Sequence, residues 1–142
     1  MAQYTGKVWV LGDDIDTDII IPTEYLALKT IEDMKQYGFS PLRPELAGQI
    51  QPGDIIVAGK NFGCGSSREQ APEVIKALGI PCIIAKSFAR IFYRNALNNG
   101  LLLLEQPELH DVVKEGDTIT VTVNEDVDYN GKKYPIASLP EN

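Results

Sequence analysis

The chain has 142 residues, 44% of them hydrophobic, and 13 basic against 20 acidic side chains give it a formal net charge of −7. This length fits one folded domain over residues 1–142 rather than two. Nucleic-acid binding needs clustered lysine and arginine, so the acidic balance excludes nucleic acid as an expected partner.

Metal-ligating side chains are scarce, with one histidine and two cysteines in the sequence. Cys64, Cys82 and His110 are far apart, and their spacing fits neither a zinc site nor a four-cysteine iron–sulfur site. Any metal is therefore expected to come from elsewhere. The N-terminus lacks the pattern of a secretory leader, and the apolar runs are too short to cross a membrane, which favours a cytoplasmic protein with reduced thiols.

The first third of the chain is rich in loops. A strand is predicted over residues 7–11, followed by an acidic loop and a short apolar run that stops at Pro22. The spacing of Ile31, Met34 and Tyr37 predicts a short helix, and residues 40–45 form a proline-punctuated connection.

The middle of the chain alternates buried strands with helices. The expected elements are a strand at 54–59, a helix over 66–79, a strand at 80–85, a helix opened by Ser87 over 88–100, and a further strand. This βαβαβ order implies parallel pairing with right-handed crossovers.

The C-terminal part changes character. Residues 118–123 alternate strictly between polar and apolar, and Asn130-Gly131 is a hairpin turn signal, so antiparallel strands are expected there. The predicted fold is α/β, with a mixed sheet, a parallel βαβ core, flanking helices and antiparallel C-terminal strands.

The strongest local signal is the glycine loop that brings Gly63, Gly65, Ser66, Ser67 and Arg68 to the start of the predicted helix. Loop amides, a helix N-terminus and a guanidinium together outline an anion site. A purely structural alternative is a capping box, in which the two serines only satisfy free amides of the helix. That alternative leaves the arginine unexplained, because the helix dipole disfavours a cation in the first turn.

Other chemistries do not fit this loop. It lacks the P-loop lysine and the third glycine of a dinucleotide-binding turn. It also lacks the flanking glycines of a serine-hydrolase elbow, and a thiol enzyme built on Cys64 would need His110 to fold back against it. The lone histidine is interpreted as a surface residue, and Arg90 and Arg94 are expected to make structural contacts or to face a partner.

The alternating aspartates of residues 14–18 resemble a calcium loop only superficially. The glycine and glutamate that an EF-hand needs at its sixth and twelfth positions are replaced by Ile19 and Tyr25. The remaining interpretations are an Asx-rich turn, a carboxylate that pairs with Arg68, or a group that orients a substrate.

Three segments, residues 14–22, 53–69 and 85–95, resemble the small subunits of 3-isopropylmalate dehydratase in the aconitase superfamily, and the likeness extends over roughly residues 5–125. The resemblance implies the swivelling β/β/α domain of that superfamily. It also implies a large subunit that carries a [4Fe-4S] cluster on its own three cysteines, with no cofactor bound by this chain.

The resemblance also implies roles for individual residues. Ser66 would be the general base, acting as an alkoxide stabilised by loop amides, the helix N-terminus and Arg68. Arg68 would bind a substrate carboxylate, Ser67 would add a hydrogen bond, Asp18 would line the site and Gly65 would contact the substrate. The open iron of the cluster would act as a Lewis acid on the leaving hydroxyl.

Residues 23–30 correspond to the substrate-recognition segment of the family. Its expected substrate-binding residues are Leu26, Ala27, Leu28 and Lys29. Ala27 stands where homoaconitase-like relatives tend to place arginine, which favours an apolar substituent such as isopropyl, although Lys29 could still reach a carboxylate.

The implied function is a heteromeric hydro-lyase that isomerises a small 2-hydroxy di- or tricarboxylic acid by dehydration and rehydration, with 2-isopropylmalate of leucine biosynthesis favoured. Homoaconitate, citramalate and 2,3-dimethylmalate dehydratases are the alternatives of the same class. A non-catalytic, anion-binding regulatory module is the alternative of another class.

Overall fold

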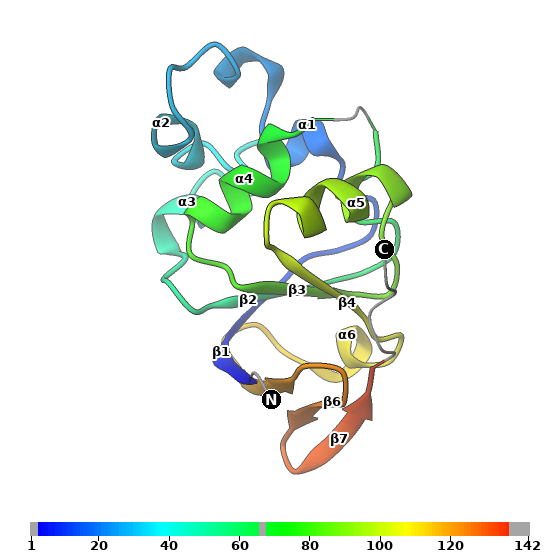
Figure 1. Cartoon of the computed structure of the whole chain (residues 1–142). Coiled ribbons are helices and arrows are strands. Elements are labelled where there is room, and N and C mark those ends of the chain that lie inside the picture. The colour runs from blue at the N-terminus through cyan, green and yellow to red at the C-terminus, as the bar shows by residue number, and fades with distance from the viewer. Residues whose placement is uncertain (1–2, 66–67, 137–142) are drawn as a thin grey trace.

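The computed structural model describes residues 3–65 and 68–136, which form one seven-stranded sheet covered by short helices (Figure 1). The strands are β1 (Gln3–Val10), β2 (Ile55–Ala58), β3 (Cys82–Ala85), β4 (Leu102–Glu105), β5 (Thr118–Thr122), β6 (Asp126–Tyr129) and β7 (Lys132–Pro135). The helices are α1 (Thr17–Ile20), the 3-10 helix η1 (Thr23–Tyr25), α2 (Ile31–Lys35), α3 (Leu46–Gln49), α4 (Gln70–Ala77), α5 (Arg90–Asn98) and α6 (Leu109–Val112).

The sheet has a parallel and an antiparallel part. The strand order is β4-β3-β2-β1-β5-β6-β7, with parallel pairing from β1 to β4 and antiparallel pairing from β1 through β5 and β6 to β7. Helices α4 and α5, which connect the parallel strands, lie on the same face of the sheet (Figure 1). The predicted α/β fold, with its parallel core and antiparallel C-terminal strands, is confirmed.

Each central strand contributes to two hydrophobic cores. Val8, Ile55 and Val57 belong to the core enclosed by the C-terminal strands and α6. Trp9 and Ile56, at the intervening positions, belong to the core beneath the helices. Because side chains alternate across a strand, this arrangement explains why the parallel strands are apolar without interruption.

The predicted hairpin turn is also confirmed. Tyr129 pairs with Lys132, and the two residues between them, Asn130 and Gly131, have φ angles of 52° and 82°. Positive φ at both positions is typical of a type I′ turn, whose twist matches that of the flanking strands.

Two helices begin later than the sequence predicts. Helix α4 begins at Gln70 rather than at residue 66, so Arg68 lies before the helix and not in its first turn. Helix α5 begins at Arg90, because the Ser87 hydroxyl accepts a hydrogen bond from the Asn61 amide at 2.8 Å instead of capping the helix. Glu69 makes no side-chain capping bond, and the serines of the predicted capping boxes lie outside the described residues.

The apolar run after the acidic loop begins within α1, a single helical turn that the sequence analysis did not predict. The Asp16 carboxylate accepts a hydrogen bond from the Ile19 amide at 2.9 Å and so caps α1. The predicted short helix is confirmed as α2, which begins after Thr30. The Thr30 hydroxyl accepts a hydrogen bond from the Asp33 amide and so caps the helix.

An ion pair ties the connection before α3 to the turn before β5. Arg43 donates from Nη1 and Nη2 to the two carboxylate oxygens of Glu115 at 2.6 and 2.9 Å. The Val10 amide also donates to Glu115, and Lys7 lies nearby, so the pKa of this carboxyl falls below its ordinary value, chiefly because of the Arg43 hydrogen bonds.

Glu115→Gln is expected to lower the free energy of unfolding by about 1 kcal/mol at neutral pH, because a bidentate but partly exposed pair is lost. A carboxyl whose pKa is lowered by folding stabilises the protein above its ordinary pKa and loses that effect as the pH falls through the lowered value. The difference between wild type and variant should therefore shrink between about pH 5 and pH 3. Urea unfolding at several pH values measures it, and a difference that is constant with pH would contradict the assignment.

Candidate functional site

Two loops that are distant in sequence run side by side beyond the ends of β1 and β2. The Asp14 amide donates to the Lys60 carbonyl at 2.8 Å, and the Gly63 amide donates to the Ile15 carbonyl at 2.7 Å. One step further on, the Thr17 amide donates to the Cys64 carbonyl at 2.9 Å. We call this set of backbone contacts the loop ladder, and it fixes the acidic loop against the glycine loop.

The aspartates of the acidic loop are bound within the fold. Asp13 accepts from the Lys60 amide at 2.7 Å, and Asp14 accepts from the Asn61 side chain at 3.2 Å. Asp16 caps α1, as described above. The Asx-turn interpretation therefore fits Asp16, whose bond is local, whereas Asp13 and Asp14 bind the segment that begins the glycine loop. Asp18 has a different role.

Asp18 pairs with Arg68, as one of the sequence hypotheses proposed. The closest atoms, Arg68 Nη2 and Asp18 Oδ1, are 2.5 Å apart. Arg68 also donates from Nη1 to the Ile21 carbonyl at 3.0 Å and from Nη2 to the Thr23 hydroxyl at 2.8 Å. The guanidinium is thus held by a carboxylate, a carbonyl and a hydroxyl of one segment, residues 18–23.

Glycine is required in the glycine loop for two reasons. Gly63 and Gly65 have φ angles of +86° and +91°, in the region that side chains disfavour. A Cβ atom on Gly63 would also lie 2.2 Å from the Phe92 ring, so the loop packs directly against the first turn of α5.

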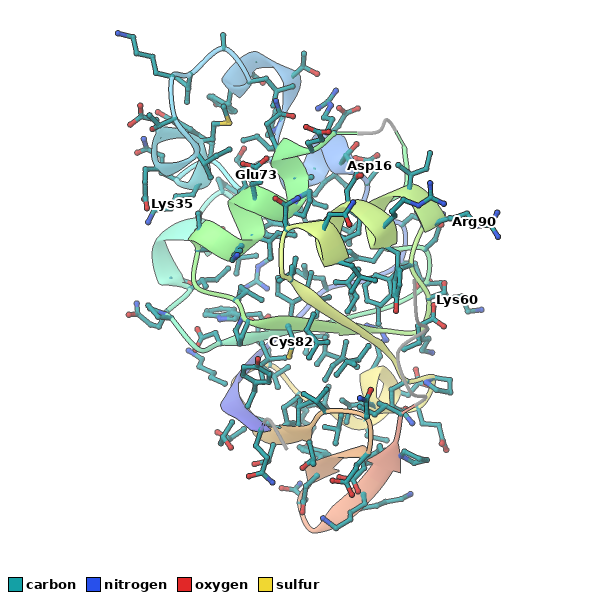
Figure 2. All side chains as sticks on the ribbon, in the orientation of Figure 1. Asp16, Lys35, Lys60, Glu73, Cys82 and Arg90 are labelled. Carbon is teal, nitrogen blue, oxygen red and sulfur yellow. The ribbon has the colours of Figure 1, made fainter. Side chains whose placement is uncertain are left out.

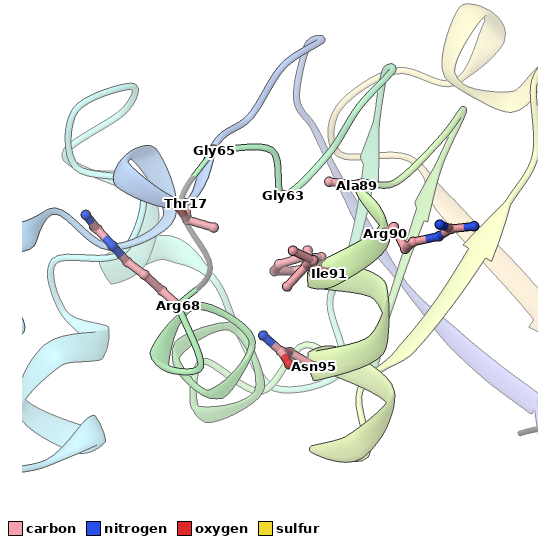
Figure 3. Close-up of a pocket in the computed structure, with 9 residues that line it drawn as sticks. Thr17, Gly63, Gly65, Arg68, Ala89, Arg90, Ile91 and Asn95 are labelled. Atoms are coloured by element: carbon pink, nitrogen blue, oxygen red, sulfur yellow. The ribbon is translucent and has the colours of Figure 1, made fainter.

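A pocket of about 290 Å³ opens between the glycine loop and α5 (Figure 3). Its lining residues are Thr17, Gly63, Gly65, Arg68, Ala89, Arg90, Ile91, Phe92 and Asn95. Gly65 and Arg68 precede and follow Ser66 and Ser67, which lie outside the described residues. The structure therefore brings Gly65 and Arg68 together at the pocket.

The guanidinium of Arg68 points away from α5 in Figure 3, toward the segment that begins with α1. Its side chain is 14% exposed, whereas that of Asp18 is 62% exposed. Asp18 is thus paired with a pocket residue without lining the pocket itself.

The predicted recognition residues do not line this pocket. Leu26 and Leu28 are half-buried and pack against the core beneath the helices, while Ala27 and Lys29 are exposed. The segment contacts the site at its beginning, through the Thr23 hydroxyl and Arg68.

Two polar pocket residues, Thr17 and Asn95, were not predicted from the sequence. Thr17, the first residue of α1, is 2% exposed, and its amide belongs to the loop ladder. Asn95 lies one helical turn after Ile91, and both side chains point from α5 toward the side where Arg68 lies (Figure 3). The helical spacing within residues 85–95 places the asparagine on the same side of the helix as Ile91, but it does not show that this side faces the glycine loop.

A cysteine nucleophile is not supported by the geometry. Burial raises the pKa of the Cys64 thiol, and the carboxylates of Asp16 and Asp14 raise it further, so the thiol stays protonated near neutral pH. Cys82 lies in β3, where burial raises its pKa to about 12. His110 is half-buried rather than a free surface residue, and its Nε2 donates to the Leu11 carbonyl at 2.8 Å.

Comparison with known proteins places these features in a family. The model of the aconitase C-terminal domain matches residues 22–109. The 3-isopropylmalate dehydratase small subunit of Lachnospira eligens is 80% identical over 140 residues, which are 99% of this chain and 85% of that protein. This chain belongs to the family of 3-isopropylmalate dehydratase small subunits.

Other members of the 3-isopropylmalate dehydratase small-subunit family agree with this assignment. The small subunit of Heliobacterium modesticaldum is 50% identical over 141 residues, covering 97% of this chain and 85% of that protein. The crystal structure of 3-isopropylmalate dehydratase from Methanocaldococcus jannaschii has a TM-score of 0.93 at 38% identity, covering 99% of this chain and 84% of that one. The fold that the resemblance implied is thus found in a solved structure of the family.

The donor set of this small subunit does not fit an iron–sulfur cluster. The sequence has two cysteines, and among residues 3–65 and 68–136 no group of three or more histidine, cysteine or carboxylate side chains could hold a metal ion. Within the same residues, no helix is long and apolar enough to cross a membrane.

Proposed function

We propose that this chain is the small subunit of a 3-isopropylmalate dehydratase that converts 2-isopropylmalate to 3-isopropylmalate by loss and readdition of water in leucine biosynthesis. The observation that carries the proposal is the 80% identity to a 3-isopropylmalate dehydratase small subunit over 140 residues. The reaction is that of a hydro-lyase, and it requires a base, a group that binds carboxylate and a group that activates the leaving hydroxyl.

Ser66 supplies the base in this proposal. Its neighbours Gly65 and Arg68 both line the pocket, which supports a place for the serine at the same wall. A serine hydroxyl ionises only when its oxyanion is stabilised, and loop amides together with a guanidinium provide that stabilisation. Ser66 would take the proton from the substrate carbon, and Ser67 would donate a hydrogen bond beside it.

Arg68 supplies the carboxylate-binding group. Its Nη2 atom lies 2.5 Å from Asp18 Oδ1, so the guanidinium already binds a carboxylate at this position. A substrate carboxylate would replace Asp18 or share the guanidinium with it, because the planar fork binds carboxylates from more than one side. This exchange would place the substrate beside the serine base.

Substrate preference is assigned to the recognition segment at residues 23–30. Ala27 is exposed between the half-buried Leu26 and Leu28, so the segment presents small and apolar groups rather than a guanidinium at this point. Such a surface suits an isopropyl group better than an additional carboxylate. Lys29, exposed and without a hydrogen bond or ion pair to the described residues, is the residue that would broaden the preference.

The cluster is placed on the large subunit in this proposal, because the donor set of this chain does not fit it. When bound there, the cluster supplies Lewis-acid chemistry for the leaving hydroxyl. The two polypeptides would then share one active site, with the base and the carboxylate-binding group on the small subunit.

Reconstitution tests this division. The purified small subunit alone is expected to be inactive, and anaerobic mixing with its large subunit should give turnover of 2-isopropylmalate. A panel with homoaconitate, citramalate and 2,3-dimethylmalate separates the substrates of related enzymes. Turnover by the metal-free chain alone would refute the shared site, and a stronger preference for another acid would refute the substrate.

A further inference from the structure

Most of the 13 basic side chains of this acidic protein have a partner within the fold. The side chains bound to a carboxylate, a carbonyl or an aromatic ring are Lys7, Lys35, Arg43, Arg68, Lys76, Lys86, Lys132 and Lys133. Arg90 and Arg94, one helical turn apart on α5, are exposed and have neither an ion pair nor a hydrogen bond to the residues that the structure describes. Two neighbouring guanidinium groups are thus left without counter-charges in a chain that carries excess carboxylate.

An exposed hydrophobic residue directly follows Arg90 and lies beside the two arginines on α5. Ile91 is 57% exposed, more than Leu42 at 43% and Val112 at 44%, the other exposed large hydrophobics among the described residues. We call Arg90, Ile91 and Arg94 the α5 face. Arginine beside an exposed aliphatic side chain is a combination that protein interfaces favour.

The α5 face continues into the rim of the pocket. Arg90 and Ile91 are among the residues that line it. The guanidinium of Arg90 nevertheless points outward, away from the pocket, in Figures 2 and 3. Its charge is therefore directed at something outside the molecule rather than at a ligand within the pocket.

We infer that the α5 face docks on the large subunit, at a surface that presents carboxylates around an apolar depression. The inference rests on the proposed function, which makes that subunit the partner. Charge complementarity selects carboxylates for the two arginines, and a partner seated on Ile91 would cover the pocket rim and help exclude water from the shared site. Nucleic acid fits less well, because the chain is acidic and an exposed aliphatic side chain lies beside the charges.

The test measures binding of the purified, cluster-loaded large subunit to full-length small-subunit variants. Arg94→Glu, which is outside the pocket lining, and Ile91→Ser should each weaken binding by about tenfold or more. Lys114→Glu is the control for Arg94→Glu, because it reverses one positive charge. Val112→Ser is the control for Ile91→Ser, because it removes an exposed hydrophobic side chain from α6. The affinity of both controls for the large subunit should stay within about twofold of wild type. Higher salt should weaken the wild-type complex more than the Arg94→Glu complex.

The outcomes distinguish a wrong docking surface from a wrong partner. Circular dichroism and thermal unfolding first establish that the variants are folded. If the α5-face variants bind the large subunit as tightly as the wild type does, the docking surface is wrong and the proposed function is unaffected. Absence of wild-type binding overturns the proposed partnership itself. If size-exclusion chromatography shows that the variants instead disrupt a dimer of this chain, the occupant is a second copy and the assignment to the large subunit is wrong.

Discussion

Ser66→Ala in the assembled dehydratase is expected to lower kcat by about 10²–10⁴-fold with little change in KM, because the proposed base is removed while the carboxylate-binding group remains. Steady-state kinetics with 2-isopropylmalate measures the effect. Deuterium exchange at the substrate carbon should fall in parallel, since the proton is removed by the same group.

Ser67→Ala is the matched control for this prediction. It changes the same side chain one position away, and only a hydrogen bond to the substrate should be lost, so the effect should be about tenfold or less. Both variants should assemble with the large subunit and unfold at the wild-type temperature. A rate for Ser66→Ala within about threefold of wild type would remove this serine from the role of base.

Arg68→Ala is expected to lower kcat/KM by about 10²–10³-fold, because the guanidinium that binds the substrate carboxylate is removed. The same change breaks the contacts to Asp18, Ile21 and Thr23, so the start of the recognition segment should also loosen. Hydrogen exchange over residues 18–25 measures this second effect.

Thr23→Val separates the two consequences of losing Arg68. It removes the 2.8 Å hydrogen bond to Nη2 and leaves the guanidinium and Asp18 in place. Activity should fall by less than about tenfold, while the relative preference for isopropylmalate over citramalate should decline. Full activity in Arg68→Ala would contradict carboxylate binding by this residue.

Local signals in the sequence predicted much of the fold because they act over a few residues. Uninterrupted apolar runs identified the strands that are buried on both faces, and Asn130-Gly131 identified the hairpin through the local preference of these two residues for positive φ. The helix starts were less predictable. Ser87 has the side chain of a helix cap, but a residue from another loop, Asn61, donates to its hydroxyl.

The candidate site was predictable where one motif supplies the residues. Gly65 and Arg68 belong to one loop, and both line the pocket. The opposite wall comes from α5, and the spacing within one segment does not reveal which helix packs against another. Asn95 and Thr17 were missed for this reason, because their place in the site depends on tertiary packing.

The loop ladder has a consequence for how this site can form and be reused. Its hydrogen bonds join residues 14–17 to residues 60–64, so each stretch is held in place by partners from the other. Closing so long an intervening chain costs conformational entropy, which the pairing of β1 with β2 offsets. The glycine loop should therefore acquire its shape only after this long-range pairing, and the same sequence grafted into another scaffold without the neighbouring strand would not be expected to keep it.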